Sequence, residues 1–108
     1  MTDNDKIPEL TNNEFENFTK EGVVLIDFFA DWCMPCVMMA PILDDLCEEF
    51  SGKMKCGKVN IDENRELATK FNVSSIPNFV LFKDGKIVEQ VIGAMNQEEL
   101  ANVIKSYI

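Results

Sequence analysis

The stretch Trp32-Cys33-Met34-Pro35-Cys36 decides the fold, because it joins an apolar run at residues 23–30 to a segment with helical periodicity. A run that is apolar on both faces is typical of a buried central strand. Two cysteines three positions apart at the start of a helix lie on one face, with Cβ atoms roughly 5–6 Å apart. We therefore expect Cys33 and Cys36 to form a disulfide with little movement of the backbone.

Position along this helix distinguishes the two thiols. The first turn presents unpaired N–H groups and the positive end of the helix dipole, and both stabilise a thiolate. We predict that Cys33 is the nucleophile, and that Cys36, one turn further in and less exposed, resolves a mixed disulfide. Pro35 suits a first helical turn, because its φ is fixed and it has no N–H.

A CxxC pair also occurs in zinc sites and in purely structural disulfides. Structural zinc requires four ligands, and this chain has no histidine, so we expect no metal site. A disulfide across so short a loop stabilises a fold little, so reversible redox chemistry explains the spacing better.

Two further cysteines, Cys47 and Cys56, stand singly in the sequence. Cys47 is about 16 Å along the helix from Cys36, too far for those two to pair. We expect both to be small apolar core residues, with a regulatory thiol as the alternative.

Composition limits the remaining possibilities. The chain has 108 residues with 46% hydrophobic content, which predicts one domain over residues 1–108 with residues 1–6 as a frayed tail. Its net charge of −9 disfavours nucleic acid and anionic membranes as partners, although solubility alone accounts for such a charge. No run has the length of a membrane span, and the first residues lack the apolar core of a secretion signal. We therefore expect a cytoplasmic protein.

Secondary structure follows from periodicity and from turn residues. Helices are expected at residues 12–20 and 34–50, and two more are expected to begin at residues 62–64 and after Asn96. The helix that begins at residues 62–64 is expected to be short. Strands are expected at residues 23–30, 54–61, 79–82 and 87–92. Thr11 and Asn96 each precede a glutamate by three positions, which indicates capping boxes. Pro8 limits residues 7–10 to an edge strand or an extended lead-in, and Pro41 is expected to kink its helix.

This order of elements predicts an α/β fold with three layers. A strand, a helix and a second strand require a parallel crossover, whereas the hairpin at residues 79–92 is antiparallel. The sheet is therefore mixed, with four or five strands and four helices flanking it. Open α/β sheets place their chemistry at the carboxyl end of a central strand, which is where Cys33 lies.

Asp27 is an anomaly within its apolar strand. Alternation places it on the same face as Leu25 and Phe29, where an ionised carboxylate loses hydration. A raised pKa and a role as proton carrier near the disulfide follow from this environment. The alternative is a buried ion pair with a lysine, for which Lys58 is the natural candidate. The Ile76-Pro77 bond leaves two possibilities open as well, a cis bond that presents extended backbone to a substrate or an ordinary trans turn.

Nearly the whole chain resembles the thioredoxin family. The matching residues are Asp27 to Cys36 with Ala40-Pro41, Lys58 to Asp62, Ser75-Ile76-Pro77, Phe82 to Gly85 and Gly93-Ala94. The resemblance implies a thioredoxin fold in which Cys33 attacks a disulfide of a target protein and Cys36 resolves the mixed disulfide. It implies that Asp27 and Lys58 handle the proton for Cys36, that Ile76-Pro77 is a cis-proline loop, and that no cofactor is bound besides the redox-active disulfide.

The resemblance also implies a surface for target proteins around the disulfide. Its predicted residues are Trp32, Met34, Pro35, Ile76, Pro77, Gly93 and Ala94. Three positions depart from the family pattern: Met34 replaces glycine, Val37 replaces lysine and Asn78 replaces threonine. We predict that Met34 adds an apolar contact at the rim and changes which partners dock, and that loss of the lysine slightly weakens support for a thiolate.

These observations favour a monomeric thiol–disulfide oxidoreductase that reduces disulfides in target proteins and is recycled by a thioredoxin reductase or an equivalent electron donor. Two alternatives stay open. The same fold could serve as a dithiol oxidant or isomerase, or the groove beside Trp32 could hold a partner in a docking subunit without enzymatic activity.

Overall fold

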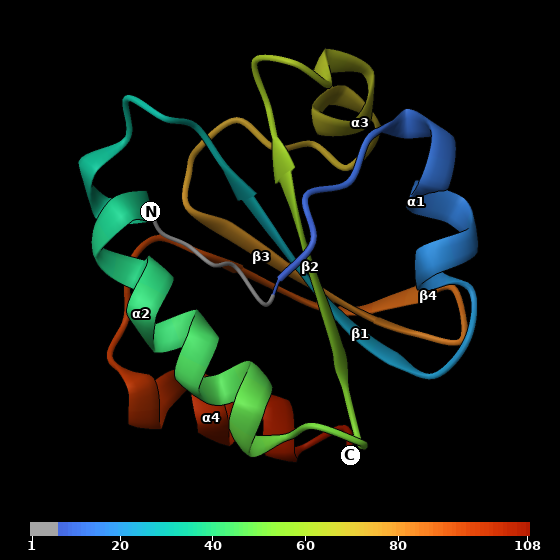
Figure 1. The fold of residues 1–108 in the computed structure, drawn as a ribbon, viewed down its shortest axis with the longest axis vertical. Helices are drawn as coiled ribbons and strands as arrows, with labels where there is room; N and C mark the ends of the chain where they lie inside the picture. Colours follow the sequence, from blue (N-terminus) through green and yellow to red (C-terminus); the bar gives the residue numbers. More distant parts are fainter. Residues whose placement is uncertain (1–6) are drawn as a thin grey trace.

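A four-stranded mixed sheet is the frame of the molecule, and the computed structural model describes it within residues 7–108 (Figure 1). Its strands lie in the order β2-β1-β3-β4 and comprise β1 (Val23–Phe29), β2 (Lys55–Asn60), β3 (Asn78–Lys83) and β4 (Lys86–Ile92). β1 pairs with β2 in parallel, whereas the β1–β3 and β3–β4 pairs are antiparallel. The predicted mixed sheet and hairpin are confirmed; the expectation for residues 1–6 lies outside the described residues.

Helices cover both faces of this sheet, which confirms the three layers (Figure 1). The helices are α1 (Asn12–Thr19), α2 (Met34–Glu49), α3 (Arg65–Lys70) and α4 (Gln97–Lys105). The buried cores show that α2 and α4 pack on one face, and α1 and α3 on the other. α2 continues through Pro41.

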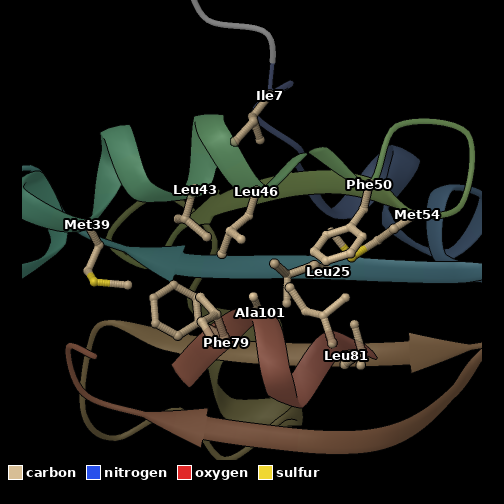
Figure 2. Packing of buried hydrophobic residues seen from close by; sticks show 12 residues of the cluster. Ile7, Leu25, Met39, Leu43, Leu46, Phe50, Met54, Phe79, Leu81 and Ala101 are labelled. Atoms are coloured by element: carbon tan, nitrogen blue, oxygen red, sulfur yellow. The ribbon is translucent and has the colours of Figure 1, made fainter. Parts of the chain in front are cut away.

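Side-chain alternation along β1 divides the core in two. Leu25 packs with α2 and α4, and Figure 2 shows Leu43 and Leu46 of α2 directed towards it. Val24 and Phe28 face the other way, towards α1 and α3. Each fully buried side chain of this size contributes roughly 1.5–3 kcal/mol. Because both faces are covered, β1 is held rigidly and fixes the position of the residues that follow it.

Two helices begin at their predicted N-caps, and the hairpin turns at its predicted residues. Thr11 and Asn96 both form complete capping boxes. The hairpin turn places Asp84 and Gly85 at φ values of 52° and 85°, the conformation of a two-residue turn that matches the twist of the strands. Residues 7–10 form a single parallel bridge to β2 rather than a full strand: Lys58 N–H donates to Pro8 O at 3.0 Å, and Leu10 N–H donates to Lys58 O at 2.7 Å.

The expectation that Cys47 and Cys56 are unpaired core residues is wrong, because they form a disulfide with their Cα atoms 6.1 Å apart. The chain reverses between α2 and β2 at residues 50–54, where Gly52 has a φ of 88°. This reversal brings the last turn of α2 over the start of β2. Both side chains are half-buried rather than enclosed.

Candidate active site

The disulfide Cys33–Cys36 lies where β1 ends and α2 begins. Cys33 is the N-cap of α2, and its Sγ accepts a hydrogen bond of 3.2 Å from the Cys36 N–H. The two Cα atoms are 5.2 Å apart, in agreement with the predicted pairing. The Cys36 N–H at the start of the helix therefore points towards the Cys33 sulfur, which stabilises negative charge on it.

The two cysteines are equally enclosed, contrary to the expectation that Cys36 is the less exposed. Cys33 is 4% and Cys36 is 5% exposed. In the disulfide form the two sulfur atoms share one small apolar cluster with Ala30, so exposure does not distinguish them. Only their positions relative to the end of the helix do so.

The loop before β3 closes over this cluster. Ile76 packs against the two cysteines, and the Ile76-Pro77 peptide bond is cis. Gly93 N–H donates to Pro77 O at 2.8 Å, which fixes the segment after β4 beside the proline. The structure therefore brings together three segments that are far apart in the sequence, as the resemblance implied.

The rim of the site is apolar and open. Trp32 is 69% and Met34 is 65% exposed, and Val37 and Met38 continue the exposed apolar surface along α2. The Trp32 indole donates from Nε1 to the Asp62 carboxylate at 2.9 Å, which orients the ring. Among the other predicted rim residues, Pro35 and Ala94 are exposed and Gly93 is half-buried, whereas Pro77 is buried.

Asp27 lies beneath this site on the α2 face of β1. Its register partner on β2 is Lys58. Burial raises the pKa of Asp27 to about 7, and the positive charge of Lys58 offsets this only in part. The Asp27 Oδ1 atom has no hydrogen-bond partner among residues 7–108, which fits a carboxyl group that holds its proton near neutrality. Burial therefore has a larger effect on the pKa of Asp27 than the charge of Lys58 has.

A pocket of about 230 Å³ connects Asp27 to the active-site disulfide. Its lining includes Asp27, Lys58, Cys36, Val37, Ala40 and Asp44. The Lys58 ammonium lies 5.6 Å from the centre of the Phe29 ring, on the same face of the sheet. The arrangement places a carboxyl group whose pKa is about 7 and the second cysteine in the lining of one pocket.

Sequence reasoning missed the part that Asp62 plays at the rim. It was expected only to begin the short helix, yet its carboxylate accepts from Trp32. Its N–H in turn donates to the Asn60 side chain at 2.9 Å, so the end of β2 positions it. The sequence did offer one indication of this role. Asp62 lies in the segment Lys58 to Asp62 that resembles the thioredoxin family, directly after β2.

A disulfide at a helix N-terminus, with a buried carboxyl of raised pKa beneath it, is the arrangement expected of a thiol–disulfide oxidoreductase. Comparisons with known proteins agree. The Thioredoxin family model matches residues 6–106, so the chain belongs to the thioredoxin family. It is a thiol–disulfide oxidoreductase whose redox-active group is the Cys33–Cys36 disulfide.

Relatives match over nearly their full length. Over 102 residues the chain is 45% identical to a thioredoxin of Listeria monocytogenes and 42% identical to one of Staphylococcus saprophyticus. These matches cover 94% of the chain, and 99% and 98% of the respective relatives. None of the helices in residues 7–108 has the length and apolar character needed to cross a bilayer.

A solved structure also shares the fold. It comes from work on the thiol resolving mechanism of yeast mitochondrial 1-Cys peroxiredoxin via glutathione/thioredoxin systems. The similarity has a TM-score of 0.86 at 38% identity and covers 94% of this chain and 95% of the other. The predicted thioredoxin fold is confirmed.

Proposed function

We propose that the chain reduces disulfides in target proteins, with Cys33 as nucleophile and Cys36 as resolving thiol. The observation that carries this is the hydrogen bond from the Cys36 N–H to the Cys33 sulfur at the start of α2. The Cys33 thiolate attacks one sulfur of the target disulfide, which releases the first target thiolate and forms a mixed disulfide. Cys36 then attacks the Cys33 sulfur, releases the second target thiol and forms Cys33–Cys36, so two electrons pass to the target.

Asp27 is proposed to take the proton that Cys36 must lose before it attacks. A base is most effective when its pKa lies near the working pH, and the pKa of Asp27 is about 7. Asp27 and Cys36 line the same pocket, so transfer through a water molecule is supported by geometry. Lys58 is the proposed partner that keeps the carboxylate form accessible, because its charge lowers the pKa of Asp27 against the effect of burial.

Targets are proposed to dock on the rim formed by Trp32, Met34, Pro35, Ile76, Pro77, Gly93 and Ala94. The exposed side chains of Trp32 and Met34 favour a target segment with apolar residues beside its disulfide. Asp31 adjoins Trp32 in the sequence, and the Asp62 carboxylate accepts a hydrogen bond from the Trp32 indole. Residues 28–40 and 87–96 contain no lysine or arginine. Targets with basic residues near the disulfide are therefore favoured over acidic ones.

A thioredoxin reductase or an equivalent donor is proposed to return the disulfide to the dithiol form, with the protein acting as a monomer. We propose the cytoplasm as the compartment, because a reductant of disulfides depends on a reducing pool that restores it. The net charge of −9 is unfavourable for association with nucleic acid or anionic membranes.

Trapping of the mixed disulfide tests the assigned roles. Both variants are made in a Cys47→Ala/Cys56→Ala background, so that only active-site thiols can react. With insulin as a disulfide substrate, Cys33→Ser should abolish reduction, and Cys36→Ser should accumulate a covalent adduct with the substrate. If Cys36→Ser forms no adduct while Cys33→Ser does, the two roles are reversed. A docking subunit, by contrast, keeps its function when both cysteines are replaced.

The reduction potential of Cys33–Cys36 separates a reductant from an oxidant or isomerase. Equilibration of the same background variant with a defined thiol–disulfide buffer should give a value near or below roughly −270 mV. A value above about −200 mV means that Met34 and Val37 have moved the pair towards an oxidant, and the reductase role is then withdrawn.

A further inference from the structure

The disulfide Cys47–Cys56 lies outside the site described above. Cys47 is in the last turn of α2, and Cys56 is the second residue of β2. Cys47 is about 16 Å along the helix from Cys36, so the active-site thiols of the same chain cannot reach it. Any electrons that reduce this bond must therefore come from another molecule.

The second pair is open to such a molecule. Both cysteines line a pocket of about 400 Å³ together with Pro8, Phe18 and Met54. This volume falls within the range of small-molecule sites. Both cysteines are half-buried, whereas Cys33 and Cys36, the redox-active pair, are only 4% and 5% exposed. The second pair is therefore less enclosed than the redox-active pair.

The residues that line the pocket carry charges of both signs. The Lys55 ammonium lies 4.6 Å from the centre of the Phe18 ring, and both residues border the pocket. Asp44 and Glu48 supply carboxylates on the α2 side. A small thiol that carries both charges, as glutathione does, finds a partner for each.

We propose that Cys47 and Cys56 form a second reversible redox site, which a low-molecular-weight thiol reduces within this pocket. A thiolate RS⁻ attacks one sulfur, the Cys47–Cys56 bond breaks, a mixed disulfide forms and the other cysteine leaves as a thiolate. A second RS⁻ attacks the RS sulfur and releases the remaining cysteine together with RSSR. Two electrons and two protons pass from two RSH to the protein. The proposal does not depend on the roles assigned to Cys33 and Cys36.

The state of this bond controls stability. The bond ties α2 to β2 across a sequence separation of nine residues. Closing a loop of this length restricts the unfolded chain, and for a chain of this size the oxidised form should melt about 10 °C above the reduced form. Because Cys47 and the active site lie at opposite ends of α2, this shift should leave reduction of targets unchanged.

Alkylation and mass spectrometry test the proposal on the full chain with Cys33→Ser/Cys36→Ser, in which only the second pair can react. The protein is equilibrated under native conditions in a series of glutathione and then dithiothreitol buffers. Free thiols are alkylated and counted, and the melting temperature is measured at each end of the series. We expect no free thiols at the oxidising end, two at the reducing end, and the stated difference in melting temperature.

A matched control replaces all four cysteines and should show one melting temperature in every buffer. The Cys47→Ala/Cys56→Ala variant, with the active-site cysteines present, should reduce insulin at the wild-type rate. If alanine disturbs packing, the measurement is repeated with Cys47→Ser/Cys56→Ser. The proposal is overturned if the bond resists the strongest dithiothreitol buffer, if two thiols are free throughout, or if both states melt together.

Discussion

Replacing Asp27 with asparagine should change how the stability of the protein depends on pH. Burial raises the pKa of this carboxyl from its ordinary value of 3.8 to about 7. Between these two values the unfolded chain is ionised at Asp27 while the native chain holds its proton, so the free energy of unfolding falls as the pH rises. The favourable contribution is therefore complete below pH 3.8 and is lost as the pH passes through 7.

The size of the effect follows from the same pKa values. The interval from 3.8 to about 7, at about 1.4 kcal/mol for each pH unit, corresponds to roughly 4 kcal/mol as an upper limit. Asparagine has almost the same shape and carries no charge at any pH. The D27N variant should therefore match the wild type near pH 4 and exceed its free energy of unfolding by up to about 4 kcal/mol at pH 8.

Urea denaturation of the oxidised proteins from pH 4 to pH 9 measures this difference. Other carboxylates titrate in both proteins, so their contributions cancel when the two curves are subtracted. Asp45→Asn serves as the matched control, because it makes the same substitution at an exposed aspartate, on α2. The reasoning is refuted if the difference in free energy of unfolding between D27N and the wild type is constant across this range. It is also refuted if the wild type becomes more stable relative to D27N as the pH rises.

Three further substitutions test the rim, the sheet and a helix cap. Met34→Gly should alter the reduction potential or the turnover of disulfide targets, because it removes a side chain that is 65% exposed at the rim; unchanged values of both would contradict the role given to Met34. Gly57→Ala should lower the free energy of unfolding by about 1–3 kcal/mol in a urea titration, since the added Cβ would lie 2.7 Å from Leu10 Cδ1; a neutral result would mean that Leu10 moves aside freely. Asn96→Ala should cost about 1 kcal/mol by loss of the 2.8 Å bond from Glu99 N–H, with Asn102→Ala as the control within α4, and equal effects of the two would argue against the cap.

Periodicity and local chemistry were enough to predict most of the fold. The apolar run at residues 23–30 identified β1, and the capping residues Thr11 and Asn96 marked the starts of α1 and α4. The position of Asp27 on the same face of β1 as Leu25 followed from strand alternation alone, as did the direction of its pKa change. These predictions succeeded because each depends on neighbours along the chain.

Features that depend on three-dimensional approach were missed or left open. The pairing of Cys47 with Cys56 depends on how residues 50–54 reverse the chain, which spacing does not encode. The bond from Trp32 to Asp62 joins positions 30 residues apart. Periodicity also could not choose between the two isomers of Ile76-Pro77, since both fit a loop, and the preference for cis came from the family resemblance.

The bridge between residues 8–10 and β2 bears on how the protein avoids self-association. β2 is the outer strand on its side of the sheet, and the bridge occupies both the N–H and the carbonyl of Lys58. An outer strand with free backbone groups is a template for pairing with another chain. Pro8 lacks an N–H, so the covering segment cannot itself extend the ladder at that residue. Loss of this bridge would leave the Lys58 backbone groups on the outer strand open to pairing with another chain and should favour aggregation.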